Sequence, residues 1–181
     1  MAESVNPTYG HAVLSINKVR VVSLDGSTYA DLDPAQEFQV KIVNRVGKLY
    51  GNDALYALSA RIVEAAGRAK AGTISSAAMG IIFGVTPAET GSTPNRITTV
   101  EFAEHHRYPY FKIYGMAYDD QIGAFQVIIN KAKVTSDVEY MMADGADTWV
   151  TPTYEYAVVK DGSNNIVTFK QLETAADLPT S

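Results

Sequence analysis

The sequence predicts a single, mainly β domain with one short helix. Apolar and polar residues alternate with period two in segments such as 38–42, which is typical of half-buried strands. Clusters of Gly, Asp and Asn separate these segments, as turns do between strands. The chain has 181 residues, which is enough for one domain with a real core and short for two. We therefore expect one domain over residues 1–181, with 1–8 and 173–181 as flexible tails.

The first half of the chain predicts a hairpin, a strand, a loop and a further strand. Residues 12–24 are rich in β-branched side chains, and Asp25-Gly26 supplies a hairpin turn after them. Residues 45–53 contain two glycines and an Asn-Asp pair, so we expect a loop there. Residues 54–72 have a helix-favouring composition, but their apolar positions form no helical stripe and Gly67 interrupts them. We predict a strand for that segment.

The helix is expected at residues 74–84. Ser75 or Ser76 can accept hydrogen bonds from the free amides of the first turn, and Gly84 suits a left-handed stop. The body of this segment is largely apolar, so such a short helix needs a sheet to pack against. Residues 85–95 contain two prolines and a glycine, which predicts an irregular loop.

The second half of the chain predicts strands joined by polar turns. The expected strands cover residues 96–104, 109–118, 124–133, 138–142, 148–159 and 166–171. The expected turns cover residues 119–123, 143–145 and 161–165.

Composition excludes several classes of function. The formal net charge is −5, and the Lys and Arg residues are scattered without a basic stripe, so tight binding of nucleic acid is not expected. The chain has no cysteine, which excludes a disulfide framework, thiolate zinc sites and a cysteine nucleophile. The first residues show no signal-peptide pattern, and no apolar run is long enough to span a membrane. We expect synthesis and assembly in the cytoplasm.

One group of residues has the types that bind metal. His105 and His106 follow Glu104, but adjacent side chains on a strand point to opposite faces. Two ligands on one face need a different spacing, so a solvated strand end is the better interpretation than a metal site.

The acidic and glycine-rich segments give no catalytic or phosphate-binding motif either. Asp119-Asp120 and the Asp144/Asp147 pair are explained as turn residues, and they lack the spaced oxygen ligands of a calcium loop. Residues 67–73 have the glycine spacing of a phosphate-binding loop without the required lysine. There is no Gly-x-Ser-x-Gly elbow. We expect no enzyme activity, no metal and no cofactor.

Aromatic side chains are the remaining signal, with eleven Tyr, six Phe and one Trp. They can serve ordinary sheet packing, a protein interface in which Tyr is enriched, or a sugar-stacking platform that includes Trp149. The residues alone leave these three interpretations open.

Taken in order, several segments resemble the major tail tube protein of long, non-contractile-tailed bacteriophages. The similarity is carried by the order and spacing of short motifs over residues 9–170. These are Tyr9-Gly10, Leu24-Asp25-Gly26, the segment 48–53, the helix 74–84, the loop 89–95, the strand 109–115, the hairpin 125–134, Asp144-Gly145 and the strand 151–159.

The resemblance implies a β-sandwich or partial barrel flanked by one helix. It implies hexameric rings that stack into a hollow tube with a continuous β-barrel around the lumen, in the virion tail, assembled in the host cytoplasm. The partners would be further copies of the chain, the tape-measure protein, the tail terminator and the distal tail or baseplate proteins. DNA would pass through the tube during ejection as cargo that the wall repels, and no membrane partner is implied.

The same resemblance suggests which residues serve assembly. We expect an interface loop at residues 45–53, with buried anchors at Leu49 and Tyr50. The inter-subunit or inter-ring positions are Lys48, Leu49, Tyr50, Gly51, Asn52 and Asp53. The second interface loop comprises Glu89, Thr90, Gly91, Ser92, Thr93, Pro94 and Asn95. The acidic residues expected to face the lumen are Glu37, Asp119, Asp120 and Glu139.

Three other functions compete with this one. A type VI secretion tube protein would share the architecture and form rings without a length-setting partner. A carbohydrate-binding β-sandwich would be a stable monomer that binds glycans through Tyr residues and Trp149. A capsid-decorating or head–tail joining protein would be β-rich without forming long tubes.

Overall fold

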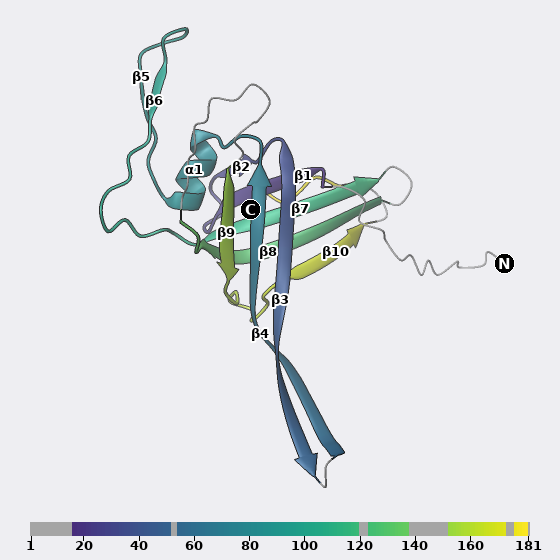
Figure 1. The fold of residues 1–181 in the computed structure, drawn as a ribbon. Helices are drawn as coiled ribbons and strands as arrows, with labels where there is room; N and C mark the ends of the chain where they lie inside the picture. The colour runs from purple at the N-terminus through teal and green to yellow at the C-terminus, as the bar shows by residue number, and fades with distance from the viewer. Residues whose placement is uncertain (1–15, 52–53, 120–122, 138–151, 173–175, 181) are drawn as a thin grey trace, which may run out of the picture.

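The computed structural model describes residues 16–51, 54–119, 123–137, 152–172 and 176–180. Over these residues the protein is mainly β, with one antiparallel sheet of eight strands, a separate two-stranded hairpin and a single helix (Figure 1). The prediction of a mainly β chain with one short helix is confirmed.

The sheet follows the strand order β2-β1-β7-β8-β9-β4-β3, and β10 pairs with β8 beside this path. The elements are β1 Lys18–Ser23, β2 Tyr29–Asp31, β3 Ala35–Gly51, β4 Ala54–Ala71, α1 Ser76–Phe83, β5 Ala88–Thr90, β6 Ile97–Thr99, β7 Phe111–Asp119, β8 Gly123–Val134, β9 Thr153–Val158 and β10 Thr168–Leu172.

Strand β8 joins two layers of the sheet. Its first half pairs with β10 from Ala124 to Ile128, and its last residues, from Ala132 to Val134, pair with β9. Strand β7 pairs with β8 along most of its length. The strands β7 and β8 therefore cross the direction of β3, β4 and β9, as Figure 1 shows.

The core lies between these layers and under the helix. It is built from inward-facing side chains of β1, β4, β7, β8 and β9 together with one face of α1. Its fully buried large members include Val19, Val21, Phe111, Ile113, Ile129, Tyr156 and Ile82.

Two glycines permit the closest approaches in this core. A Cβ on Gly115 would lie 2.4 Å from the ring of Phe38, and a Cβ on Gly67 would lie 2.2 Å from the carbonyl oxygen of Gln39. Tyr156 also fills the space at Gly67, and its hydroxyl donates to the Gln39 oxygen at 3.0 Å. Any larger side chain at Gly67 would have to displace backbone, so β3, β4 and β9 are held together tightly at this point.

The helix α1 has both of the predicted caps. The Ser75 hydroxyl accepts from the Ala78 amide at 3.1 Å. Gly84 adopts a left-handed conformation with φ of 71°, and its amide donates to the Gly80 carbonyl. The hairpin turn at Asp25-Gly26 is confirmed as well, since Val22 pairs with Tyr29 across it.

Residues 176–180, which we expected to belong to a flexible tail, lie against the outer face of the sheet. Leu178 packs with Val22, Tyr114 and Ile128. Its carbonyl accepts a 2.6 Å hydrogen bond from Arg20, which is buried and also pairs with Asp31.

Two of the predicted loops are wrong in part. Residues 45–51 continue β3 rather than forming a loop, because their backbone groups pair with β4 as far as Ala54. Residues 88–90 form β5 within the predicted loop 85–95, and of the predicted strand 96–104 only Ile97–Thr99 is a strand.

Two further predicted elements are confirmed, and others lie outside the described residues. The strand over 54–72 is confirmed as β4, and the 161–165 turn is confirmed by an Asp161–Asn165 backbone hydrogen bond of 2.9 Å. The predicted strand 138–142 and turn 143–145 lie outside the described residues, as do 120–122 of the predicted turn 119–123.

Candidate assembly surface

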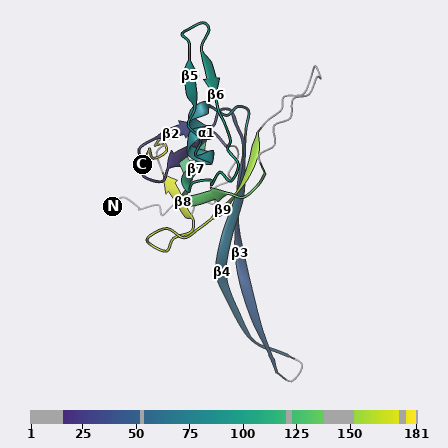
Figure 2. The ribbon, with the colours of Figure 1, turned by 90° about the vertical axis from the view of Figure 1, so that its left-hand side faces the viewer.

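The outer half of the β3–β4 hairpin extends away from the rest of the protein (Figures 1 and 2). We call residues 44–50 and 55–63 the arm. Strand β4 pairs with its second neighbour, β9, only from Ala65 to Lys70, so the arm begins where that third strand stops. Beyond this point β3 and β4 pair only with each other, from Asn44 opposite Ile62 to Gly51 opposite Ala54.

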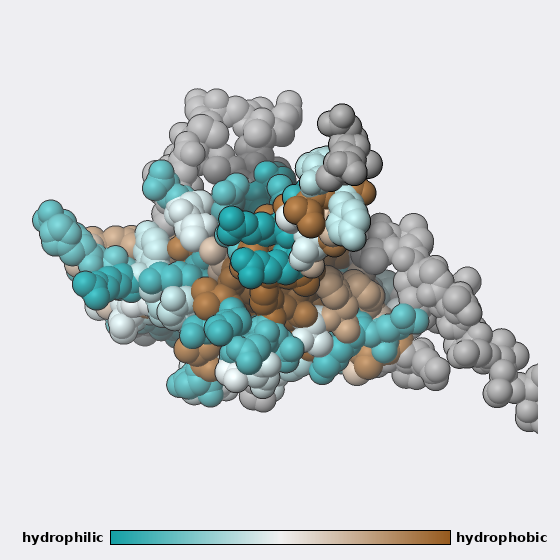
Figure 3. All heavy atoms as spheres, turned by 90° about the horizontal axis from the view of Figure 1, so that it is seen from below, coloured by the Kyte–Doolittle hydropathy of each residue, from teal (hydrophilic) through white to brown (hydrophobic). Residues whose placement is uncertain are grey.

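The arm carries much of the exposed apolar surface. It holds eight of the sixteen large hydrophobic side chains that are exposed in the described part of the protein, and Tyr56 reaches 82% exposure. These eight are Val46, Leu49, Tyr50, Leu55, Tyr56, Leu58, Ile62 and Val63. Figure 3, which views the molecule from the arm end, shows hydrophobic side chains gathered around its centre. A concentration of this kind typically marks an interaction surface.

The register places most of these side chains on one face. Along β3, the side chains of residues 38, 40 and 42 pack against the core. Because side chains alternate along a strand, those of Val46, Lys48 and Tyr50 lie on the same face. Cross-strand partners share a face, so Ala60, Leu58 and Leu55 of β4 lie on it too. This face, which we call the apolar face of the arm, comprises Asn44, Val46, Lys48, Tyr50, Leu55, Leu58, Ala60 and Ile62. It is an uncovered continuation of the core-facing side of the sheet.

The opposite face of the arm is more polar. Arg45 pairs with Arg61 there, and Gly47 pairs with Ser59. Leu49 opposite Ala57 is the one apolar pair on it. Over its described residues the arm contains three cations, Arg45, Lys48 and Arg61, and no carboxylate.

An isolated two-stranded ribbon is marginally stable in water. Fully burying one Leu, Ile or Val side chain contributes about 1.5–3 kcal/mol. Covering the apolar face would therefore stabilise the arm strongly, whereas the arm gains none of this while the face is exposed.

The second hairpin, β5–β6, projects at the other end of the molecule from the arm in both views (Figures 1 and 2). Glu89 and Thr90 lie on β5, and Gly91, with φ of 79°, begins the turn that continues through residues 92–95. All of these residues are exposed, and Glu89 forms an ion pair of 3.4 Å with Arg96. The second expected interface segment is thus a protruding hairpin tip.

The first expected interface segment lies near the arm tip. Lys48, Leu49 and Tyr50 are exposed residues of β3, Gly51 ends that strand, and Asn52 and Asp53 lie outside the described residues. Leu49 and Tyr50 were expected to be buried anchors, but within this chain they are exposed. The β4 half of the surface, with Leu55, Leu58 and Ile62, was not selected from the sequence, although it alternates as a strand and its apolar residues signalled it.

The structure describes two of the four acidic residues expected at a lumen, Glu37 and Asp119. Glu37 forms an ion pair of 2.6 Å with Arg68 on the neighbouring strand. Asp119 ends β7 opposite Gly123, while Asp120 and Glu139 lie outside the described residues.

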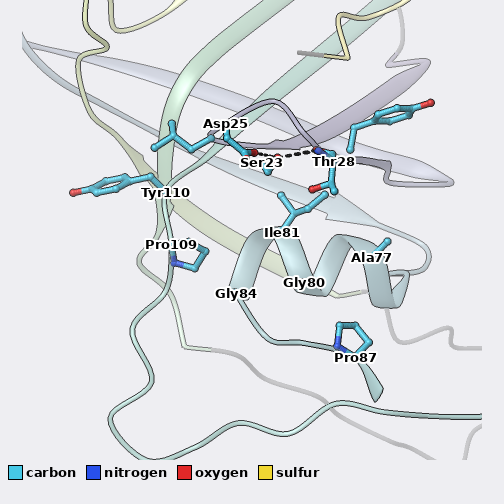
Figure 4. Close-up of a pocket in the computed structure, with 12 residues that line it drawn as sticks. Ser23, Asp25, Thr28, Ala77, Gly80, Ile81, Gly84, Pro87, Pro109 and Tyr110 are labelled. Carbon is cyan, nitrogen blue, oxygen red and sulfur yellow. Dashed lines mark hydrogen bonds between the residues drawn. The ribbon is translucent and has the colours of Figure 1, made fainter. Parts of the chain in front are cut away.

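The groove between helix α1 and the β1–β2 turn has a volume of about 750 Å³ (Figure 4). Among the described residues that line it, the one carboxylate is Asp25, which accepts from the Ser23 hydroxyl at 2.5 Å and from the Ser27 amide at 3.0 Å. These hydrogen bonds, that of Ser23 first, lower the pKa of Asp25 to about 2. With so low a pKa, Asp25 is a poor general base for the neighbouring Ser23 and Ser27 hydroxyls.

The histidines give no metal site in the described part of the chain, where no three His, Asp or Glu side chains converge. His105 and Glu104 are both exposed and lie 3.4 Å apart. His106 contacts the Phe83 carbonyl oxygen at 2.6 Å through Nε2.

Comparison with known proteins assigns no family: no family model and no curated protein matches this sequence. Within the described residues, no helix combines the length and apolar character needed to cross a membrane.

Proposed function

We propose that this chain is a structural subunit that polymerises into a tube of stacked hexameric rings, as the tail tube protein of a long-tailed bacteriophage does. In this role it is a virion protein, and the tube is the conduit through which DNA is ejected into the host. The resemblance of the ordered segments over residues 9–170 suggests the family, and the arm is the observation that carries the proposal.

The arm suits a subunit better than a free monomer. A monomer gains nothing from an extended ribbon with Leu58, Ile62 and Tyr50 exposed, and such a surface favours aggregation. A neighbouring copy that covers this apolar face converts the same surface into a stable interface.

The placement of the two protruding hairpins supports stacking. The arm and β5–β6 project from opposite ends of the molecule (Figures 1 and 2). A contact between different surfaces of two copies is heterologous, so it repeats without closing when it runs along an axis and gives a filament.

The charge balance agrees with a DNA conduit. The chain has a formal net charge of −5, and a wall of the same sign as phosphate prevents DNA from sticking during passage. In this proposal the partners are further copies of the chain, together with tape-measure, terminator and distal tail proteins.

Negative-stain electron microscopy of the purified chain over a concentration series, with sedimentation velocity on the same samples, tests the proposal. We expect rings and hollow tubes of uniform width that increase with protein concentration. A single species with the mass of one chain at every concentration would contradict it.

A further inference from the structure

An apolar groove lies beside α1, and no described segment of the chain fills it. One wall is the β1–β2 turn with Leu24 and Tyr29, which are 45% and 51% exposed. The other wall is α1, from which Ile81 points into the groove in Figure 4. A volume of about 750 Å³ is within the range of about 300–1,000 Å³ found for binding pockets.

Helix α1 is apolar on both sides, although only one side faces the core. Ala78, Ile82 and Phe83 are buried in the core, while Ala77 and Gly80 line the groove. These two small residues allow another chain to approach the helix closely. The groove wall is therefore shaped for contact, and the described part of the chain leaves it open.

The groove and the arm are at different ends of the protein. Helix α1 and the arm tip lie at opposite ends of the molecule in both Figure 1 and Figure 2. A chain cannot place its own arm tip in its own groove in this arrangement, whereas a second copy stacked in the same orientation brings its arm toward the groove.

The charges of the two surfaces are complementary. Of the three arm cations, Lys48 lies on the apolar face, while Arg45 and Arg61 lie on the opposite face. Among the described residues of the groove lining, Asp25 is the one carboxylate. Lys131 and Lys133 lie over the ring of Tyr110, with their nitrogens 4.8 Å and 5.3 Å from its centroid. Lys48 of a docked arm is thus favoured on the Asp25 side of the groove and disfavoured on the Tyr110 side.

We infer that the groove between α1 and the β1–β2 turn receives the apolar face of the arm of a second copy of this chain, stacked head to tail. This inference rests on the proposed assembly through the arm and identifies the surface that accepts it. The contact is heterologous, in contrast to a symmetric pairing of two arms.

Three single variants and one matched control distinguish the head-to-tail arm–groove contact from a symmetric arm–arm contact. Leu58→Asp places a charge on the apolar face of the arm and leaves the groove intact. Ala77→Arg fills the groove with a bulky cation and leaves the arm intact, while Ala77→Ser is its matched control. Leu24→Asp alters the opposite wall of the groove, so the test survives if the helix variant fails to fold. Circular dichroism melting checks the fold of each variant.

We expect Ala77→Arg and Leu24→Asp to lose tubes, as Leu58→Asp does, while Ala77→Ser forms tubes as the wild type does. Mixing folded Ala77→Arg with folded Leu58→Asp restores one arm–groove contact. Sedimentation velocity should then show a mixed complex that neither variant forms alone and that does not grow into tubes.

If the wild type forms tubes and both groove variants form them in equal abundance, the inference is overturned while the proposed function stays intact. Failure of the mixed variants to associate would also overturn it, because the intact arm of Ala77→Arg would then not bind the intact groove of Leu58→Asp. Absence of wild-type tubes, in contrast, counts against the proposed function itself.

Discussion

The two halves of the β3–β4 hairpin differ in their surroundings although the same two strands form both. In the inner half, Phe38, Val40 and Ile42 pack against the core and β4 pairs with β9. In the arm, Val46 and Leu58 occupy the equivalent face and are exposed. The antiparallel ladder runs through both halves, with register shifts at Val43/Asn44 and Leu49/Tyr50.

This comparison shows that pairing and burial are separate properties of a strand. Backbone hydrogen bonds continue as long as two strands face each other, whereas burial needs a third element over the face. An arm that is paired but uncovered is ready for a contact that the single chain cannot supply. Substitutions placed in each half test how far the two halves differ in stability and in assembly.

The largest effect on the fold is expected from a glycine of the inner half. Gly67→Ala would place a Cβ 2.2 Å from the Gln39 carbonyl oxygen, so overpacking should lower the free energy of unfolding by about 1–3 kcal/mol or more. In the arm, a Cβ on Gly47 would meet nothing closer than the Ser59 oxygen at 4.0 Å. We therefore expect Gly47→Ala to change the free energy of unfolding by less than about 0.5 kcal/mol. Urea unfolding monitored by circular dichroism measures both. Equal effects of the two substitutions would contradict the comparison.

A smaller effect is expected from the hydrogen bond that joins the inner half to β9. Tyr156→Phe removes the hydroxyl that donates to the Gln39 oxygen at 3.0 Å and keeps the buried ring. We expect a loss of about 1 kcal/mol in the free energy of unfolding, typical of one hydrogen bond. The control is Tyr56→Phe in the arm, where the side chain is 82% exposed and no change is expected. A loss in the control as large as that of Tyr156→Phe would argue against this account.

The acid dependence of stability should arise in the body and not in the arm. A hydrogen bond from Lys18 lowers the pKa of Asp177. Partial burial acts to raise the pKa of Asp31, but the hydrogen bonds and charges of Arg20 and Lys18 together outweigh it and lower that pKa. A lowered folded-state pKa stabilises the protein above the unfolded value of about 3.9. This stabilisation is lost as the pH falls below that value toward the folded-state pKa.

Melting temperatures measured from neutral pH down to acid pH should therefore decrease less steeply in Asp31→Asn than in the wild type. The Asp31→Asn protein is also expected to be less stable at neutral pH, because the buried Arg20 loses one of its two carboxylate partners and keeps only Asp177. Parallel curves for the two proteins would show that these ion pairs do not contribute.

The smallest effect on the single chain is expected at the arm itself. Tyr50→Asp changes a side chain that is 64% exposed, so the free energy of unfolding of the monomer should stay within about 0.5 kcal/mol of the wild type. Assembly should nevertheless stop, because Tyr50 lies on the apolar face of the arm. Tubes of unchanged abundance would show that Tyr50 lies outside the interface.

Local chemistry explains which parts of this fold were predictable. The helix was found from Ser75 and Gly84, whose cap interactions depend on residues within a few positions. The turn at Asp161 was found for the same reason, since its carboxylate accepts from Ser163 and Asn165. Each of these features is encoded within a short stretch of sequence.

The features that were missed depend on distant partners. Gly47 and Gly51 suggested a loop, but the ladder with β4 holds 45–51 in a strand. The position of Leu178 depends on Arg20, which is 158 residues away in the chain. The exposure of the arm could not be predicted from alternation, because alternation defines a face and does not say what covers it.

A charge scan of the two faces of the arm tests the central claim most directly. Leu58→Asp and Ser59→Asp introduce the same charge at adjacent exposed positions, the first on the apolar face and the second opposite it. Electron microscopy and sedimentation velocity would be recorded for both variants beside the wild type. The account predicts folded monomers and no tubes for Leu58→Asp, with tubes retained by Ser59→Asp. Tubes of wild-type abundance from Leu58→Asp would contradict the assignment of the apolar face of the arm as the assembly surface.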